Sequence, residues 1–345
     1  TFDPAAIVPP KLPPGHNLNK QLPRPRQVLN FVVRGGDESE TAVIALGDML
    51  FDSPYIFGEP ARSLQISCNT CHNKGVTNPN FFIPGLSTSH GGLDVSSNFF
   101  RPASNNAVGD SIDIPDLRGI KFTGPYGRNG RVGSLREFTR NVIVGEFNGP
   151  EPAPVVLDAI VAYMNEFDLL PNPNLEPTGK LSAAAPDAAR RGEVLFNTSF
   201  PQMNNLSCAD CHRPASNFAD GLSHDIGSVT RSSAYSTDGA MNTPTLLSAA
   251  YTAPYFHDGS QPTLRSVTDW FNEAFSLGLT DAQASDLTAY VETVGSGEDS
   301  YEETLYTLQS EMEEFKFFLS SYEFVKELDD RNLMNTLFQT VEFEI

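Results

Sequence analysis

Hydrophobic positions recur at helical spacing in four segments of the chain, and long stretches rich in glycine and proline lie between them. The segments are 40–51, 154–167, 186–196 and 281–294, and their apolar residues predict amphipathic helices. Thr280 and Asp281 give the last segment an N-terminal capping signal. We therefore expect a mainly α-helical protein whose helices are separated by long loops.

The predicted helices fall into two similar halves. The helix at 40–51 ends in Gly-Asp-Met-Leu-Phe, and the helix at 186–196 ends in Gly-Glu-Val-Leu-Phe. Further along, four short motifs within 115–136 recur within 244–265, each 129 residues later and without a gap. They are Pro-x-Leu, Thr-x-Pro-Tyr, a glycine and a Leu-Arg pair. An internal repeat of this kind indicates a duplicated domain.

The segments outside the repeat complete the predicted organisation. Residues 1–36 are rich in proline and basic residues, which predicts an extended strap, because proline removes backbone donors and blocks helix formation. The proline-rich stretch 171–177 is the expected linker. We predict an N-terminal strap (1–36), an N-terminal domain (37–170), a linker with a C-terminal domain (171–296) and a C-terminal helical extension (297–345).

The extension is strongly acidic. It holds thirteen acidic and three basic residues, so its charge of −10 is half of the net charge of −20 of the 345-residue chain. Its apolar residues from Leu305 to Leu328 recur at helical spacing, which predicts one or two amphipathic helices. Because such an apolar stripe needs burial, we expect the extension to pack on the body of the protein.

The acidic composition limits the kinds of partner. It argues against nucleic acid and anionic membranes as partners and favours a cationic protein. No run of about 18 apolar residues predicts a transmembrane helix.

All four cysteines fall in two copies of one motif. Residues 68–72 read Cys-Asn-Thr-Cys-His, and residues 208–212 read Cys-Ala-Asp-Cys-His. The C-x-x-C-H motif is the attachment signature of a c-type haem, whereas zinc sites and disulfides do not require the following histidine. The sequence therefore predicts two covalently bound haem c groups, held by Cys68, Cys71 and His72 and by Cys208, Cys211 and His212. Haem attachment of this type follows export, so we interpret Thr1 as the start of a chain whose signal peptide has been removed, in a periplasmic or otherwise extracytoplasmic compartment.

The arrangement resembles the bacterial di-haem cytochrome c peroxidases and the related MauG-type enzymes. The matching pieces are the Gly-x-x-Leu-Phe segments ahead of each haem motif and, most specifically, Thr-Ala-Pro-Tyr-Phe-His-Asp-Gly at 252–259. The resemblance covers about residues 40–296 and implies two tandem cytochrome c-type domains with one haem each. In the family the N-terminal haem handles peroxide, the C-terminal haem delivers electrons, and a calcium ion lies between the domains.

For the first haem, the resemblance points to two residues besides the proximal ligand His72. His90 lies in a segment similar to the family's movable histidine segment, so it is a candidate distal ligand; a surface histidine is the alternative. Glu146 corresponds to the glutamate that follows the Gly-Arg segment. Peroxide cleavage needs a base to move a proton between the two oxygens. The apolar neighbours of Glu146 are expected to raise its pKa.

For the second haem, with His212 as proximal ligand, the sequence departs from the family. The family's distal methionine or tyrosine corresponds to Phe271, which has no ligating atom. Met241 is a substitute candidate, although a core methionine is an equally good interpretation. A five-coordinate second haem is the third alternative. His257 resembles a residue close to the haem rather than a ligand.

Between the domains, the resemblance implies a calcium site. The matching positions are Asp113 and the main-chain carbonyls of Thr252 and Pro254, which offer the hard oxygen ligands that calcium prefers. A turn-capping aspartate is the other interpretation of Asp113. The family's inter-haem tryptophan corresponds to Arg128, and a family glutamine corresponds to Phe138.

Three functional hypotheses follow. The first is a di-haem peroxidase that reduces hydrogen peroxide at the N-terminal haem with electrons from a donor protein such as a basic cytochrome c. The second is a MauG-like enzyme that uses peroxide to oxidise residues of a partner protein. The third is a non-catalytic electron carrier. A homodimer is compatible with each hypothesis.

Overall fold

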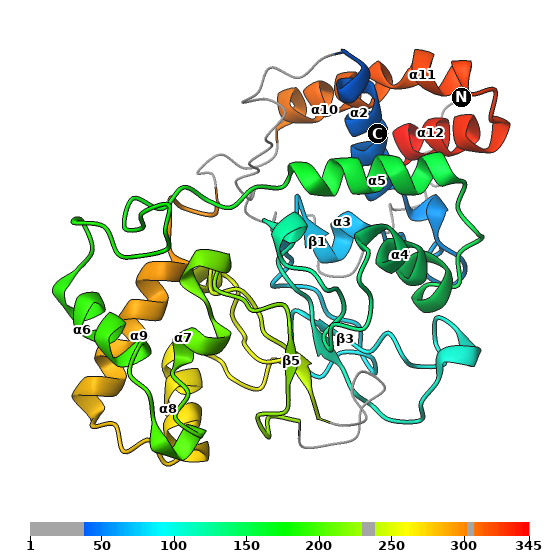
Figure 1. Ribbon diagram of the computed structural model, residues 1–345. Coiled ribbons are helices and arrows are strands. Elements are labelled where there is room, and N and C mark those ends of the chain that lie inside the picture. Colours follow the sequence, from blue (N-terminus) through cyan, green and yellow to red (C-terminus); the bar gives the residue numbers. More distant parts are fainter. Residues whose placement is uncertain (1–37, 230–238, 302–306, 345) are drawn as a thin grey trace.

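The computed structural model describes residues 38–229, 239–301 and 307–344 and is mainly helical over these ranges (Figure 1). The predicted strap at 1–36 lies outside the described residues. Two lobes lie side by side. Lobe 1 comprises the described residues up to 170, lobe 2 comprises 171–229 and 239–296, and the C-terminal helices lie on lobe 1 (Figure 1).

Lobe 1 is built on a close crossing of two helices. Helix α2 (Glu38–Asp52) packs on α5 (Pro154–Glu166). Gly47 stands at the contact, where an added Cβ would lie 2.1 Å from the Ala159 carbonyl oxygen, so only glycine permits this approach. The ring of Tyr163 lies edge-on to Phe51, and both rings are buried. This crossing explains the Gly-x-x-Leu-Phe pattern at the end of the first predicted helix.

Lobe 2 repeats the crossing with different residues. Helix α6 (Asp187–Phe196) packs on α9 (Asp281–Gly295), and a Cβ at Gly192 would lie 2.0 Å from the Asp286 carbonyl oxygen. The predicted cap of α9 is confirmed, because the Thr280 hydroxyl accepts a hydrogen bond from the Gln283 N–H. The four helices predicted from the sequence pattern are thus all present, with ends that differ by no more than two residues.

The remaining elements are short. Each haem motif forms a single helical turn, α3 (Cys68–Cys71) or α7 (Cys208–Cys211). Lobe 1 also contains α4 (Leu135–Arg140) and the π-helical turn η5 (Asn141–Glu146), and lobe 2 contains α8 (Leu264–Ala274). Three two-stranded antiparallel pairs join β1 (His72–Asn73) to β2 (Val76–Thr77), β3 (Gly92–Leu93) to β4 (Ile112–Asp113) and β5 (Ser223–His224) to β6 (Met241–Asn242).

The two lobes meet through a reciprocal pair of backbone hydrogen bonds. The Asp113 N–H donates to the His257 carbonyl at 3.0 Å, and the Asn242 N–H donates to the Arg128 carbonyl at 2.9 Å. Asp113 and Asn242 are counterparts 129 residues apart, and so are Arg128 and His257. The lobes therefore contact each other as the two halves of a pseudo-symmetric dimer would.

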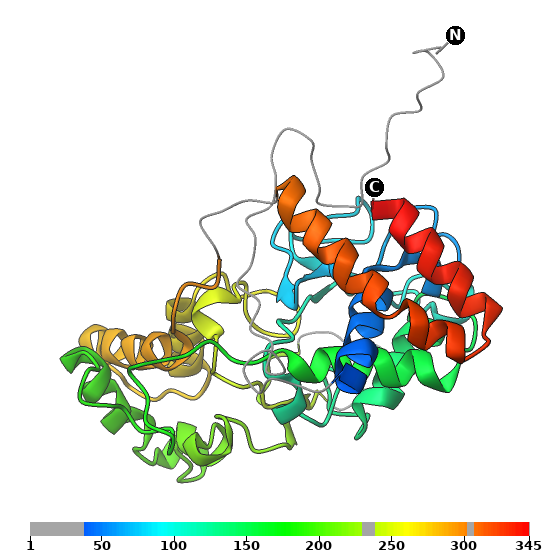
Figure 2. The ribbon, with the colours of Figure 1, turned by 90° about the horizontal axis from the view of Figure 1, so that it is seen from above.

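The acidic extension forms three helices, α10 (Leu308–Ser320), α11 (Tyr322–Glu327) and α12 (Arg331–Glu344). Helices α10 and α12 pack on α2, and Figure 2 shows α10 crossing above α2. Phe318, Val325 and Leu337 are buried in the lobe 1 core. The Thr340 hydroxyl donates to the Ser53 hydroxyl at 2.7 Å. The extension packs on the body as expected, but largely through residues outside the predicted stripe, because its members Leu308, Met312, Leu319 and Leu328 are exposed.

A buried charge cluster joins the extension to lobe 1. Lys74, two residues after the haem motif, has its Nζ 3.7 Å from Asp52 Oδ2 and also pairs with Glu314 of α10. Burial raises the pKa of Asp52 to about 7 and that of Glu344 to about 8, and it raises the pKa of Asp48. Protonation of some of these carboxyls relieves an excess of buried negative charge around one ammonium group.

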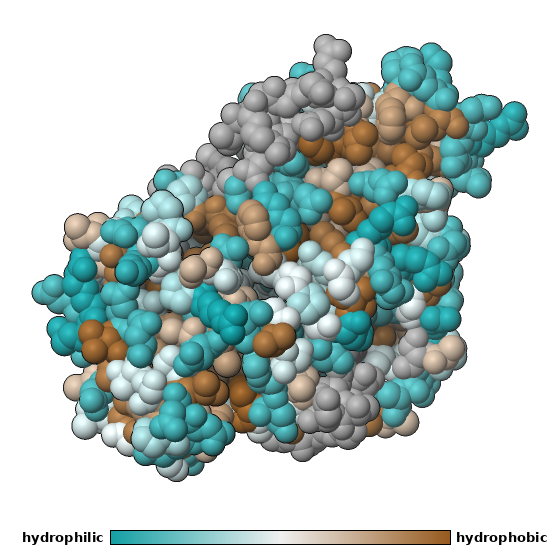
Figure 3. Space-filling model, in the orientation of Figure 1, coloured by the Kyte–Doolittle hydropathy of each residue, from teal (hydrophilic) through white to brown (hydrophobic). Residues whose placement is uncertain are grey.

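The face of the molecule in Figure 3 is mostly hydrophilic, with apolar residues gathered over the C-terminal helices. Leu308, Met312 and Leu319 of α10 are among the exposed large hydrophobic residues. Among the described residues, no helix combines the length and apolar character needed to cross a membrane.

Candidate functional site

The first haem motif is held in a defined conformation by its own local hydrogen bonds. Ser67 caps the turn α3, with its hydroxyl accepting from the Thr70 N–H. The Nδ1 of His72 lies 2.9 Å from the Pro115 carbonyl oxygen, which fixes the ring and leaves Nε2 to bind iron. Burial lowers the pKa of His72 to about 4, against the raising effect of this carbonyl. The imidazole is therefore neutral at pH 7, as a metal ligand must be.

A cavity of about 320 Å³ opens beside this motif. Cys68, Cys71 and His72 line it together with many apolar side chains. The lining also holds three arginines and three acidic residues, which are Arg118, Arg128, Arg131, Asp113, Asp116 and Glu146. Residues 242–245 of lobe 2 also line it, so the cavity reaches the contact between the lobes.

Glu146 lies in this cavity, as the catalytic hypothesis requires. It is the last residue of the π-helical turn η5, a rare conformation that occurs mostly at functional sites. Its Oε1 lies 3.7 Å from Arg131 Nη2, and 23% of its side chain is exposed. Burial raises the pKa of Glu146 to about 7, although the Arg131 charge opposes this rise. A carboxyl with this pKa can both accept and donate a proton near neutral pH.

Aromatic rings flank the same side of the cavity. The rings of Tyr126 and Phe138 stack with centroids 6.3 Å apart, and the Arg131 guanidinium lies 5.8 Å from the Phe138 ring centroid. Phe138 therefore packs against the cation that faces Glu146, where the family has a glutamine. It contributes an apolar wall and no hydrogen bond.

The cavity fits the chemistry of a haem. Its walls combine apolar side chains, two thiols placed on one helical turn and a neutral imidazole, which are the groups that hold a c-type haem. Arg118 lines it with a buried side chain, and its Nη1 has no hydrogen-bond partner. A buried cationic donor of this kind matches the carboxylate groups that a haem carries.

The second haem motif has a similar but more open setting. The residues of α7 and His212 are only partly buried. The Nδ1 of His212 lies 3.2 Å from the Phe218 carbonyl oxygen. Burial lowers the pKa of His212, whereas backbone hydrogen bonds to Phe218 and Pro244 raise it. Pro244 is the repeat counterpart of Pro115, but the carbonyl within hydrogen-bonding distance of His212 Nδ1 is that of Phe218.

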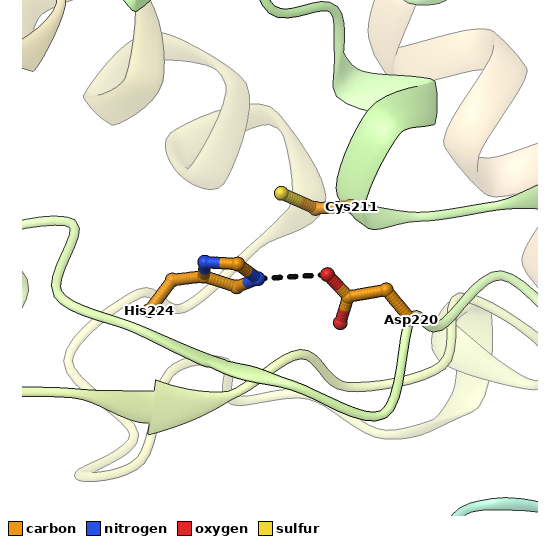
Figure 4. A group of neighbouring side chains, drawn as sticks. All are labelled: Cys211, Asp220 and His224. Carbon is orange, nitrogen blue, oxygen red and sulfur yellow. Dashed lines mark hydrogen bonds and ion pairs between the residues drawn. The ribbon is translucent and has the colours of Figure 1, made fainter.

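A histidine–carboxylate pair stands beside Cys211 in lobe 2 (Figure 4). His224 Nε2 lies 2.7 Å from Asp220 Oδ2. Burial would raise the pKa of Asp220, but hydrogen bonds from His224, Leu222 and Thr243 hold it below its usual value. A thioether at Cys211 would leave the His224–Asp220 pair next to the porphyrin edge.

The candidate distal residues of the second haem lie on different elements. Met241 is half-buried in β6, where it pairs with His224 of β5. Phe271 lies on α8 in an aromatic group with Phe256, Trp270 and Phe275, and it stacks on Phe275 at 5.9 Å. Ligation by Met241 stays a prediction.

His90 lies on the surface of lobe 1. It is exposed, and its ring lies 5.1 Å from that of Phe82. It is not among the residues that line the cavity. This position fits the surface interpretation better than the distal one, and ligation by His90 stays a prediction.

The predicted calcium ligand Asp113 lies between the lobes. Burial raises the pKa of Asp113 to about 7, although Arg128 lowers it. The Arg128 guanidinium contacts both the carbonyl and Oδ2 of Asp113, whereas Oδ1 is buried without a hydrogen-bond partner. The unpartnered oxygen suits a cation, but the adjacent guanidinium already supplies a positive charge. Calcium at Asp113, Thr252 and Pro254 stays a prediction.

The sequence predictions did not include Arg118 or the His224–Asp220 pair. The signal for Arg118 was available in the repeat, because Leu117-Arg118 corresponds to Leu246-Leu247. His224 had no such signal, since a histidine and an aspartate four residues apart are common in loops.

Comparisons with known proteins bear on the fold and on the C-terminal half of the chain. Residues 186–340 match the family model described as di-haem cytochrome c peroxidase. A comparison with curated proteins finds no match. Among solved structures, a MauG-like protein associated with microbial copper homeostasis is similar with a TM-score of 0.53 and 17% identity, over 82% of this chain and 96% of that one.

Hydrazine synthase of Kuenenia stuttgartiensis is similar with a TM-score of 0.51 and 18% identity, over 85% of this chain and 100% of that one. At these identities the likeness shows the fold alone. The predicted resemblance is confirmed over residues 186–340, and the mainly helical fold is confirmed as well. The matched family is one of haem c-containing oxidoreductases. Residues 186–340 thus match the di-haem cytochrome c peroxidase family, and a MauG-like protein shares the fold of most of the chain.

Proposed function

We propose that the protein reduces hydrogen peroxide in lobe 1, with electrons that enter through lobe 2. The observation that carries this proposal is the position of Glu146 in the same cavity as Cys68, Cys71 and His72, with a pKa raised to about 7. A haem bound there would supply an iron centre that coordinates peroxide and accepts or donates electrons.

The role of Glu146 is to move one proton. Its carboxylate would take a proton from one peroxide oxygen and return it to the other, which would leave as water when the O–O bond breaks. The complete reaction consumes one peroxide, two protons and two electrons and yields two waters. Arg131 keeps Glu146 partly ionised at neutral pH, because its charge lowers the carboxyl pKa.

Lobe 2 is the proposed entry point for electrons. Its haem motif is less buried than that of lobe 1, which favours exchange with a second protein. The net charge of −20 suits a basic donor such as a cationic cytochrome c, with an association rate that falls as salt rises. The periplasmic location, the donor and a homodimer belong to this proposal.

The experiment that tests the proposal replaces Glu146 by glutamine. Glu146→Gln removes the proton acceptor but keeps the shape of the side chain, so the rate of reaction with peroxide should fall by about 10²- to 10⁴-fold. Glu137→Gln is the matched control, since Glu137 is an exposed residue of α4 outside the cavity. Both variants should bind two haems. An unchanged rate in Glu146→Gln would remove Glu146 from the reaction.

The MauG-like alternative receives less support from the site. Oxidation of a distant protein by electron holes needs an oxidisable side chain between the haems. Arg128 occupies the position that the resemblance matches to the family's tryptophan. A guanidinium is not readily oxidised, and its positive charge disfavours a second positive charge beside it. We therefore prefer peroxide reduction to oxidation of a partner protein.

A further inference from the structure

Arg118 is the most deeply buried of the three arginines in the lobe 1 cavity. Only 1% of its side chain is exposed, against 22% for Arg128 and 36% for Arg131. Water can satisfy the guanidinium groups of Arg128 and Arg131 at the cavity mouth. The hydrogen-bond acceptors of the Arg118 guanidinium must lie inside the protein, because its side chain is not exposed to water.

Those partners are incomplete. The Nε of Arg118 donates to Asp116 Oδ2 at 2.9 Å, and Nη2 donates to the same carboxylate. Its Nη1 is buried without any hydrogen-bond partner, although the residue lines the cavity that holds Cys68 and His72. A buried charged donor without a partner is strongly unfavourable, so the structure leaves a place for an anion at this nitrogen.

The repeat shows that this arrangement is specific to lobe 1. The counterpart of Arg118 is Leu247, and the counterpart of Asp116 is Thr245. Both positions follow Pro115 or its counterpart Pro244. Lobe 2 therefore keeps the proline of this loop but lacks the ion pair.

We propose that Arg118 holds a propionate of the haem in lobe 1 through its Nη1, and that lobe 2 has no equivalent contact. The propionates are the only anionic groups that a haem brings into this cavity. A bound guanidinium stabilises the ferrous haem relative to the ferric haem, because reduction removes one positive charge beside a fixed cation. Arg118 thereby raises the potential of the lobe 1 haem. The inference requires a haem in lobe 1, but it does not depend on reaction with peroxide.

The test compares variants of the full-length di-haem protein by potentiometric titration, with low-temperature EPR to separate the two ferric haems. Arg118→Leu introduces the residue that lobe 2 has at this position. It should lower the ferrous-to-ferric ratio of the lobe 1 haem about tenfold at fixed potential, which corresponds to a reduction potential lower by about 59 mV for one electron. Arg118→Lys should recover part of this shift. Arg136→Leu, which removes an exposed arginine paired with Asp158, is the control and should change nothing.

Asp116→Thr with Arg118→Leu removes both charges and copies lobe 2 completely, so it avoids leaving Asp116 buried without a partner. If Arg118 holds a propionate, this double variant still lowers the ratio of the lobe 1 haem, and the propionate bending band of that haem changes in the resonance Raman spectrum. A double variant with the potential and the Raman band of the native protein would overturn the proposal. It would mean that Arg118 serves only to pair with Asp116.

Discussion

The two lobes share one backbone plan but have different charges around their haem motifs. Both cross two helices at a glycine, and in both a backbone carbonyl lies within hydrogen-bonding distance of Nδ1 of the proximal histidine, that of Pro115 in lobe 1 and that of Phe218 in lobe 2. The charged residues differ at matched positions: Arg118, Arg128 and Arg131 of lobe 1 correspond to Leu247, His257 and Ser260 of lobe 2, and Asp113 and Asp116 correspond to Asn242 and Thr245. The duplicated scaffold therefore accounts for the two haem motifs, and the substituted charges are the main difference between the two settings on which the proposed division of roles rests.

The extension adds a second asymmetry. Helices α10 and α12 cover α2 of lobe 1, and their buried carboxylates surround Lys74, two residues after His72. The α2 side of lobe 1 is thereby covered, and the haem motif of lobe 1 is more buried than that of lobe 2. A peroxide site gains from enclosure, and an electron-entry site gains from exposure.

The largest expected difference between the lobes concerns the proximal ligands. His72→Gly should abolish the reaction with peroxide, because it removes the ligand of the haem next to Glu146. His212→Gly should leave a single reaction with peroxide but stop steady turnover with a protein donor. Stopped-flow absorption with one equivalent of peroxide distinguishes the two variants. Equal loss in both would contradict the division of roles between the lobes.

The extension should stabilise lobe 1 selectively. Leu337→Ala deletes a fully buried side chain of α12 and should cost about 2–5 kcal/mol of the unfolding free energy of lobe 1. Phe338→Ala, at an exposed position on the same helix, is the matched control. Denaturant unfolding followed by hydrogen exchange assigns the loss to a lobe. A loss confined to lobe 2 would contradict the observed packing.

The helix crossings offer a test in which the lobes should respond alike. Gly47→Ala and Gly192→Ala each place a Cβ about 2 Å from a carbonyl oxygen of the partner helix. Overpacking of this kind should destabilise each lobe by about 1–3 kcal/mol, beyond what alanine gains as a helix former. Thermal unfolding of the two variants measures the effect. A neutral result in one lobe alone would show that the crossings are not equivalent.

The smallest expected effect is a pH dependence confined to the extension interface. Asp52 and Glu344 have pKa values raised from 3.8 and 4.5 to about 7 and about 8 by burial, among Asp48, Lys74 and Glu311. Their contribution to stability is full below the ordinary values and is lost as pH rises through the raised ones. Asp52→Asn with Glu344→Gln should flatten the dependence of the melting temperature on pH between 5 and 8. Glu313→Gln, an exposed position of α10, should leave it unchanged.

The sequence predicted what depends on local pattern and on the repeat. The four main helices, the cap at Thr280 and the two haem motifs depend on residues close in sequence, and the structure contains all of them. Glu146, chosen from the resemblance and its apolar neighbours, lines the cavity beside the first haem motif, and its catalytic role stays a prediction.

Other features depend on contacts between distant residues and could not be predicted in this way. The reciprocal bonds of Asp113 with His257 and of Asn242 with Arg128 join segments that no local pattern connects. The extension was expected to pack on the body. The sequence did not predict that it packs on lobe 1, because this depends on the complementarity of two surfaces. The unpartnered nitrogen of Arg118 is visible only once the cavity is formed.

The central claim is that lobe 1 holds the haem that reacts with peroxide. The most direct test is low-temperature EPR of the di-haem protein before and after one equivalent of peroxide, in the ferric and the half-reduced states. We expect a high-spin ferric signal in at least one of these states that disappears with peroxide in the native protein and persists in Glu146→Gln. Two low-spin signals that do not change on addition of peroxide in either state would contradict the claim and identify an electron carrier.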